Sequence, residues 1–194
     1  AEKKGGAAEV ALARREAALL TKYRRHFYGD LWGNEDVDPS VEATFRHGYF
    51  DAIAIRPEPD EDLSLEALVT AAATHESSRF LRSLSVRCPD LGALQNLLDT
   101  TPLPRTLTTI DLREEGGYRR NGAIAVRGFT KQLDHLVHLA IQGEGIVTIA
   151  SLEGATALRE LVLRGSELRL HKETLASVPT LEKLSLDGGV KFEP

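Results

Sequence analysis

Residues 158–186 read LRELVLRGSELRLHKETLASVPTLEKLSL, and one spacing of leucines occurs in them twice. The spacing is L-x-x-L-x-L, at residues 158–163 and again at residues 181–186. Leu-x-Leu alternation places two apolar side chains on one face of a short strand, and the leucine three residues earlier marks the turn into that strand. Such a unit exposes its apolar face unless a neighbouring unit covers it. The stretch therefore predicts stacked units whose strands form a parallel ladder.

The same frame, with Phe, Ile or Val also allowed at the leucine positions, occurs four more times upstream. Among the 29 leucines of the chain, one or two such frames could arise by chance, but six at near-regular spacing indicate a repeat. The sequence therefore predicts an α/β solenoid with about six short parallel strands and with helical or irregular returns. The frames start 22 to 31 residues apart, at Phe50, Leu81, Leu107, Leu136, Leu158 and Leu181.

The segments between the frames predict several kinds of return. Residues 60–78 lack glycine and proline and carry apolar residues at helical spacing. Residues 90–99 again carry apolar residues at helical spacing, and two prolines follow them. Both segments predict helices. The shorter return over residues 165–179 predicts a tighter turn. Residues 114–130 are the least regular return, for which a binding loop and a mobile loop without function both stay open.

The N-terminal residues do not contain the frame. Residues 1–8 (AEKKGGAA) have the composition of a flexible linker. From Val10 to Tyr28 the apolar residues follow helical spacing, and Gly29 suits the end of a helix. Because the first unit of a solenoid would otherwise expose its apolar face, we expect residues 9–49 to form an N-terminal helical cap and residues 50–194 to form the repeats.

The phrases ALRELVL (residues 157–163) and TLEKLSL (residues 180–186) resemble the leucine-rich repeat family, and the resemblance spans residues 50–187. More narrowly, REAALLTKYRRHFYGDL (residues 15–31) and FRHGYFDAIAI (residues 45–55) are similar to bacterial proteins in which the repeats follow a repeat-companion domain. The chain departs from the family where an asparagine usually satisfies carbonyls of the turn. An irregular solenoid is therefore expected. The residues at that position are Glu58, Pro89, Glu115, Glu144, Ser166 and Gly189.

Composition excludes several classes of protein. The 194 residues are 42% hydrophobic and 27% charged, which fits one folded domain and excludes wholesale disorder. No apolar run reaches the length of about 20 residues that spans a bilayer, and the first residues do not resemble a signal peptide. The single Cys88 excludes a disulfide framework and fits a reducing, cytoplasmic compartment. A net charge of −5 argues against binding of nucleic acid.

A row of arginines follows the frames and supplies the candidate binding site. The residue directly after each frame should lie on the solvent side of the ladder, where the strands are about 4.8 Å apart. Such a row of arginines would attract carboxylates or phosphates through bidentate, charge-assisted hydrogen bonds. In the alternative interpretation, Asp111, Glu160 or Glu182 simply pairs with the arginines. The row consists of Arg56, Arg87, Arg113, Gln142, Arg164 and Asp187, and Arg82 and Arg159 form a neighbouring column.

Motifs of enzymes and cofactor sites are weak in this sequence. It contains neither a phosphate-binding loop nor a Gly-x-Ser-x-Gly elbow. His135 and His138 have no third ligand at suitable spacing, so we interpret them as structural and expect no metal or cofactor. Cys88-Pro-Asp90 resembles the Cys-x-Asp motif of bacterial leucine-rich repeat ubiquitin ligases, but the likeness amounts to two residues. We therefore expect an inert or weakly reactive thiol and no catalytic residues.

These observations predict a non-enzymatic scaffold for protein recognition, with a partner that carries an acidic patch. The alternative is a regulatory or targeting module that contacts the catalytic part of a larger parent protein. The absence of methionine and the linker-like first residues favour that alternative. Nucleic acid and membranes are not expected as partners.

Overall fold

The computed structural model describes residues 3–23, 26, 28, 41–56, 65–88, 101–114, 123–127 and 134–193. The chain divides into two compact units, Ala1–Pro39 and Ser40–Pro194. The first unit contains helix α1, Lys3–Lys22, in which Val10 and Leu12 are exposed. Because α1 begins at Lys3, residues 3–8 are helical where their composition predicted a linker. The role of α1 as a cap stays a prediction.

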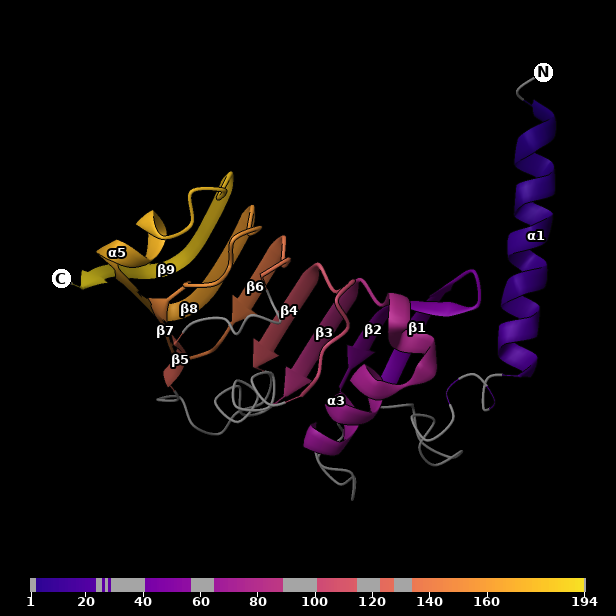
Figure 1. Ribbon diagram of the computed structural model, residues 1–194, viewed down its shortest axis with the longest axis horizontal. Coiled ribbons are helices and arrows are strands. Elements are labelled where there is room, and N and C mark those ends of the chain that lie inside the picture. The colour runs from indigo at the N-terminus through magenta and orange to yellow at the C-terminus, as the bar shows by residue number, and fades with distance from the viewer. Residues whose placement is uncertain are drawn as a thin grey trace. The chain divides into compact units, whose positions relative to one another are not determined.

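The described residues of the second unit form a nine-stranded, mostly parallel sheet with solenoid-like stacking (Figure 1). The strands that contain the six frames form its main ladder, and each neighbouring pair is parallel, as the sequence predicted. In order, the main ladder consists of β2 (Tyr49–Ile55), β3 (Ser83–Cys88), β4 (Thr109–Glu114), β6 (His138–Gln142), β8 (Glu160–His171) and β9 (Lys183–Glu193).

The last two apolar positions of the frame form two rows of side chains across the main ladder. From β2 to β8 every member of these rows is buried, so the rows make the inner face of the ladder and build the core. On β9 the first row is no longer buried, and Leu184 is 39% exposed. The first row consists of Ile53, Leu84, Ile110, Leu139, Leu161 and Leu184, and the second consists of Ile55, Val86, Leu112, Ile141, Leu163 and Leu186.

The first leucine of the frame lies in a tight turn before β3, β4, β8 and β9, as predicted, whereas the first frame position of β2, Phe50, already lies within the strand. The N–H of Leu107 donates to the carbonyl of Pro104, three residues earlier. A threonine hydroxyl before the leucine links neighbouring turns, since Thr180 Oγ1 donates to the carbonyl of Leu158 at 2.8 Å. These bonds satisfy backbone groups that the turns would otherwise leave unpaired. The same bond to a carbonyl three residues earlier recurs at Leu81, Leu158 and Leu181.

Strand β1 (Val41–Arg46) pairs antiparallel with β2 at one edge of the sheet. His47 and Gly48 connect the two strands with φ values of 55° and 82°, which suit a two-residue hairpin turn. β1 and β2 therefore form a hairpin, so residues 41–49 are not the end of a helical cap. The sequence of β1, VEATFR, alternates apolar and polar residues, which is the period of a strand with one buried face.

The helices of the second unit are short. Helix α3 (Leu65–Thr74; Figure 1) lies within the predicted helix over residues 60–78. Both α3 and the 3₁₀ helix η2 (Glu76–Phe80) contact β2. Between them the buried Ser78 hydroxyl donates to the carbonyl of Ala72 at 2.5 Å. The predicted helix over residues 90–99 lies outside the described residues. Within the described part of the chain, no helix combines the length and the apolar character needed to cross a membrane.

A second parallel ladder, which the sequence analysis did not predict, accompanies the first. It consists of β5 (Ala123–Arg127), β7 (Ile146–Ser151) and the second halves of β8 and β9. The predicted tight turn over residues 165–179 is therefore wrong for residues 165–171, which continue β8, and only α5 (Lys172–Ala176) is helical there. Leu168 and Leu170 are buried and alternate with charged residues, so this segment has the period of a strand.

Glycines form the corner between the two ladders. A Cβ on Gly165 would lie 2.9 Å from the carbonyl oxygen of Gly145, and one on Gly188 would lie 2.0 Å from that of Gly165. The turns therefore stack too closely for side chains at these positions. The N–H and the hydroxyl of Ser166 both donate to the Gly145 carbonyl, at 2.9 and 3.0 Å.

Candidate protein-binding face

The residues after each frame form a row across the outer face of the main ladder, opposite the buried leucines. We call this row the arginine column. Arg56 directly follows β2, and backbone pairing aligns the other members strand by strand. The structure therefore brings the predicted residues together in one row. From β3 to β9 the aligned members are Arg87, Arg113, Gln142, Arg164 and Asp187.

Arg113, in the middle of the column, is held by a carboxylate of its own strand. Its Nε lies 3.1 Å and its Nη2 2.8 Å from Asp111 Oδ2. Residues two apart on a strand face the same side, so the pair lies on the outer face. The bidentate contact fixes the orientation of the guanidinium group. The alternative interpretation from the sequence is thus confirmed for Asp111.

Arg56 and Arg164 make longer ion pairs near the two ends of the column. Arg164 Nε lies 3.7 Å from Asp187 Oδ2, and Arg56 Nη2 lies 3.9 Å from Glu42 Oε2. Both arginine side chains are about half exposed, so each pair stabilises the fold by only about 0–1 kcal/mol. Arg56, Arg113 and Arg164 thus each lie close to a carboxylate. The column is therefore a row of ion pairs and not a continuous stripe of positive charge.

Arg82 and Arg159 belong to the turns that enter β3 and β8. Arg159 Nη1 lies 3.0 Å from Glu182 Oε1, and Arg82 Nε lies 3.8 Å from Asp51 Oδ1. The contact with Glu182 again confirms the alternative interpretation, in which a nearby carboxylate pairs with an arginine. At the corresponding positions of the intervening turns the chain has Thr108 and Val137, so the two arginines do not form a continuous column.

Glu160 joins a polar row on the outer face that sequence reasoning missed. The residue was expected to pair with an arginine, but its carboxylate contacts Lys183 Nζ and lies 3.0 Å from His138 Nδ1. These three residues are in register on β6, β8 and β9. The hydrogen bond from Lys183, followed by that from His138, lowers the pKa of Glu160 below its ordinary value of 4.5. No sequence motif marks this row, because its members are 22 and 23 residues apart.

The two histidines that could suggest a metal site have separate partners. His135 Nδ1 lies 3.1 Å from Asp134 Oδ1, whereas His138 contacts Glu160. In the described ranges no three of the residues His, Cys, Asp and Glu gather as metal ligands would. Cys88 ends β3 and pairs with Glu114 on β4. The motif that begins at Cys88 continues outside the described residues, so the inert thiol stays a prediction.

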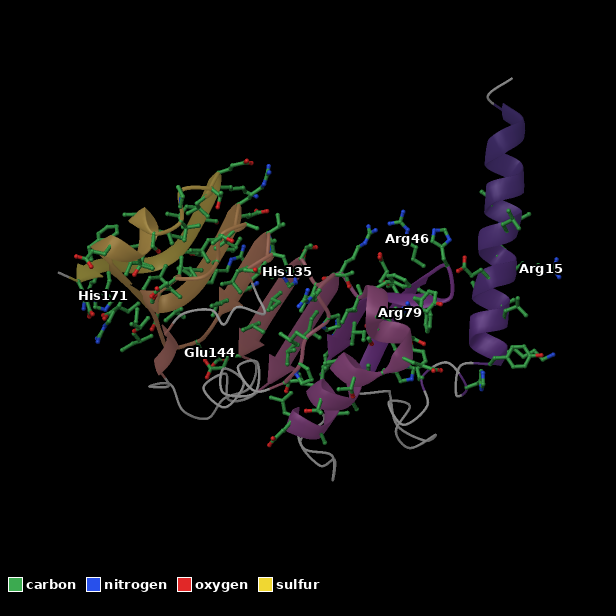
Figure 2. The ribbon with its side chains drawn as sticks, viewed as in Figure 1. Arg15, Arg46, Arg79, His135, Glu144 and His171 are labelled. Carbon is green, nitrogen blue, oxygen red and sulfur yellow. The ribbon has the colours of Figure 1, made fainter. Side chains whose placement is uncertain are left out.

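The second ladder has a charged cluster of its own, which sequence reasoning also missed. Glu167 lies 2.6 Å from Lys191 Nζ and 2.5 Å from Arg169 Nε. Hydrogen bonds from Lys191 and then from Arg169 lower the pKa of Glu167, and the bond to Glu167 raises the pKa of Arg169. His171 lies at the β9 end of the sheet (Figure 2). Its Nε2 is 3.3 Å from Glu193 Oε2. The alternation in residues 167–171, ELRLH, could have indicated this face.

Comparisons with known proteins add no assignment. No protein-family model, no curated protein and no solved structure matches this chain.

Proposed function

We propose that this chain is a non-enzymatic leucine-rich repeat solenoid that recognises a protein through the outer face of its main ladder. The observation that carries the proposal is the alignment of the arginine column, from Arg87 on β3 to Asp187 on β9. Neighbouring strands are about 4.8 Å apart, so the column presents regularly spaced side chains on a hydrogen-bonded sheet. A rigid surface of this kind loses little conformational entropy when a partner binds.

The repeat pattern supports the family assignment. All six frames coincide with parallel strands, and their apolar positions are in register. The chain departs from the family at its corners, where Ser166 and the glycine stack take the place of asparagine side chains. The departure affects how the chain leaves each strand, whereas the outer face that we assign to binding lies on the strands themselves.

The chemistry of the column supports a partner with exposed carboxylates. A guanidinium group has five N–H donors, and one carboxylate occupies at most two of them, so a paired arginine can accept a second carboxylate. The guanidinium group of Arg113 is already oriented by Asp111. The Arg164 side chain is half exposed, and its ion pair with Asp187 is long, at 3.7 Å. A partner's carboxylates can therefore join or replace these contacts at little cost.

Capture from a lysate of the source organism, with charge-matched variants, tests this proposal. The wild-type chain is compared with Arg87→Glu/Arg113→Glu/Arg164→Glu and with a control, Arg15→Glu/Arg46→Glu/Arg105→Glu. The control reverses three exposed arginines outside the column, so both variants have the same net charge. We expect a protein that the wild type and the control retain and that the column variant loses. For this protein, the affinity should fall at least about tenfold in the column variant.

Two other results would contradict the proposal. Equal retention of the same protein by all three chains would show that recognition does not use the column. Retention of no protein by any folded chain would contradict a separate partner and favour the alternative, a module that contacts its own larger parent. Circular dichroism checks that both variants are folded before the comparison.

A further inference from the structure

The inner face of β9 is not covered. Leu184, Val190 and Phe192 are 39%, 38% and 56% exposed. Their partners in register on β8 are Leu161, Leu168 and Leu170, each 0% exposed. The residues of β9 and their partners on β8 are all apolar and all lie on the inner face of the sheet. The difference arises because among the described residues β9 pairs with β8 alone, so its outer edge and its inner side chains have no neighbouring strand.

The outer edge of β9 is long for an edge strand. β9 has 11 residues, which at about 3.3 Å per residue gives an edge of about 36 Å. An exposed strand edge presents backbone N–H and C=O groups that pair readily with another strand. Native chains usually shorten or interrupt such edges, and β9 contains no proline. Its exposed apolar row adds a hydrophobic contribution to pairing.

We propose that the edge of β9 binds β9 of a second copy of this chain, in an antiparallel pair centred on Gly188. A twofold axis through Gly188 makes such a contact self-complementary and closed. Gly188 is the sixth of the 11 residues, so the pair uses the whole strand. β9 bends at the corner between the ladders, and the axis exchanges its two arms. The main-ladder arm of each copy then meets the second-ladder arm of the other.

The side chains of β9 are complementary to their own sequence in this register. Leu184 lies opposite Phe192 of the second copy, and Leu186 lies opposite Val190 of the second copy. All four belong to the inner face, so the two uncovered rows meet. On the outer face Lys183 lies opposite Glu193 of the second copy, and the twofold axis makes this ion pair occur twice. Opposite charges facing each other across antiparallel strands stabilise the pair.

Registers shifted by two residues keep the same faces but match less well. A pair centred on Asp187 would place Lys183 opposite Lys191 of the second copy, so like charges would meet. A pair centred on Gly189 would leave Leu184 beyond the end of the opposing strand. Charge and apolar contact therefore both favour the register centred on Gly188.

Sedimentation equilibrium tests the association. We expect the chain to shift from 21.2 kDa to twice that mass between about 1 and 500 μM, a range that covers common reversible dimers. Leu184→Asp should raise the dissociation constant at least about 100-fold, because it places a charge in the apolar contact. The matched control is Leu12→Asp, which makes the same change at an exposed position of α1 and should leave the constant within about twofold.

A monomer at every concentration would overturn the proposal. A dimer that Leu184→Asp and Leu12→Asp affect equally would also overturn it, because the contact would then lie elsewhere.

The register is tested on the unaltered chain by zero-length carbodiimide cross-linking. A mixture of ¹⁵N-labelled and unlabelled chains distinguishes links between copies from links within one. We expect a mixed-isotope link between Lys183 and Glu193. A mixed link between Asp187 and Lys191 as the main product would overturn the register centred on Gly188. This readout does not depend on the folding of any variant.

Discussion

At the scale of the residue, Glu160 is held by neighbours on both sides. His138 on β6 and Lys183 on β9 lie in register with it, and both contact its carboxylate. Together they lower the pKa of Glu160, with the Lys183 hydrogen bond as the largest cause. Glu167 has a similar arrangement on the second ladder, where Lys191 and Arg169 lower its pKa. Each carboxylate therefore links the stability of the sheet to pH.

Acid should weaken these contacts in a defined range of pH. A carboxylate whose pKa is lower in the folded chain stabilises the fold above its ordinary value of 4.5. This contribution is lost as the pH falls through the lowered value. Glu160→Gln should therefore lower the thermal midpoint near pH 7, and the difference from wild type should shrink below pH 4.5. Thermal melts followed by circular dichroism between about pH 7 and 3 measure the midpoints of the variant and of the wild type, and thus their difference at each pH.

Glu16→Gln is the control for this experiment, because Glu16 is an exposed glutamate of α1 that lies beyond the first turn of the helix. Its midpoint should follow that of the wild type throughout the range. A constant difference between Glu160→Gln and wild type at every pH would show that the Glu160 ion pairs are not the source of the pH dependence.

At the scale of the element, β8 and β9 show that leucines at the same frame position can contribute differently to the stability of the fold. Both strands carry the frame and then a second apolar alternation after the corner. β8 has neighbours on both sides, whereas β9 has only β8 among the described residues. Burial of an apolar side chain contributes in proportion to the area removed from water. The leucines of β8 should therefore contribute far more to folding than those of β9.

Leu161→Ala and Leu184→Ala compare these contributions at paired positions. Leu161 is 0% exposed, so its truncation should lower the free energy of unfolding by about 2–5 kcal/mol. Leu184 is 39% exposed, and its truncation should cost less than about 1 kcal/mol. Urea unfolding at low protein concentration, where any association is suppressed, measures both. Equal costs would mean that β9 is covered in solution even at that concentration.

At the scale of the whole molecule, the sheet is a stack in which each turn contacts mainly the turns beside it. The main ladder pairs only sequential turns, from β2 to β9. In such an arrangement stability is close to a sum of local terms and neighbour contacts. A defect in one turn should therefore spread to its neighbours and leave distant turns intact.

Gly165→Ala tests this behaviour, because its Cβ would lie 2.9 Å from the Gly145 carbonyl oxygen and 3.0 Å from Val147 Cγ2. The crowding should cost about 1–3 kcal/mol. Native-state hydrogen exchange should become at least about tenfold faster in β7, β8 and β9 and stay unchanged in β2 and β3. Gly189→Ala is the control, since its nearest contact is an ordinary 3.5 Å. A uniform increase over the whole sheet would show that the second unit opens as one block.

Particular elements show how far prediction from the sequence reaches. The six frames located all six strands of the main ladder, and the arginine column followed because residues at one frame position must share one face. The β1 hairpin and the second half of β8 were missed, although both have strand alternation. The β1 residues were assigned to a helical cap, and the second half of β8 was assigned to a return between strands. Both assignments overlooked the strand-like alternation of apolar residues.

The sequence by itself determined the parallel main ladder and the alignment of its outer column, because the frame sets which side chains face the core. Only the tertiary structure decided which charges meet, as when Glu160 contacts Lys183 and His138 and not an arginine. It also decided that the glycines stack at a corner and that the apolar row of β9 is exposed. These properties depend on distances between residues 20 or more positions apart, which local periodicity does not contain.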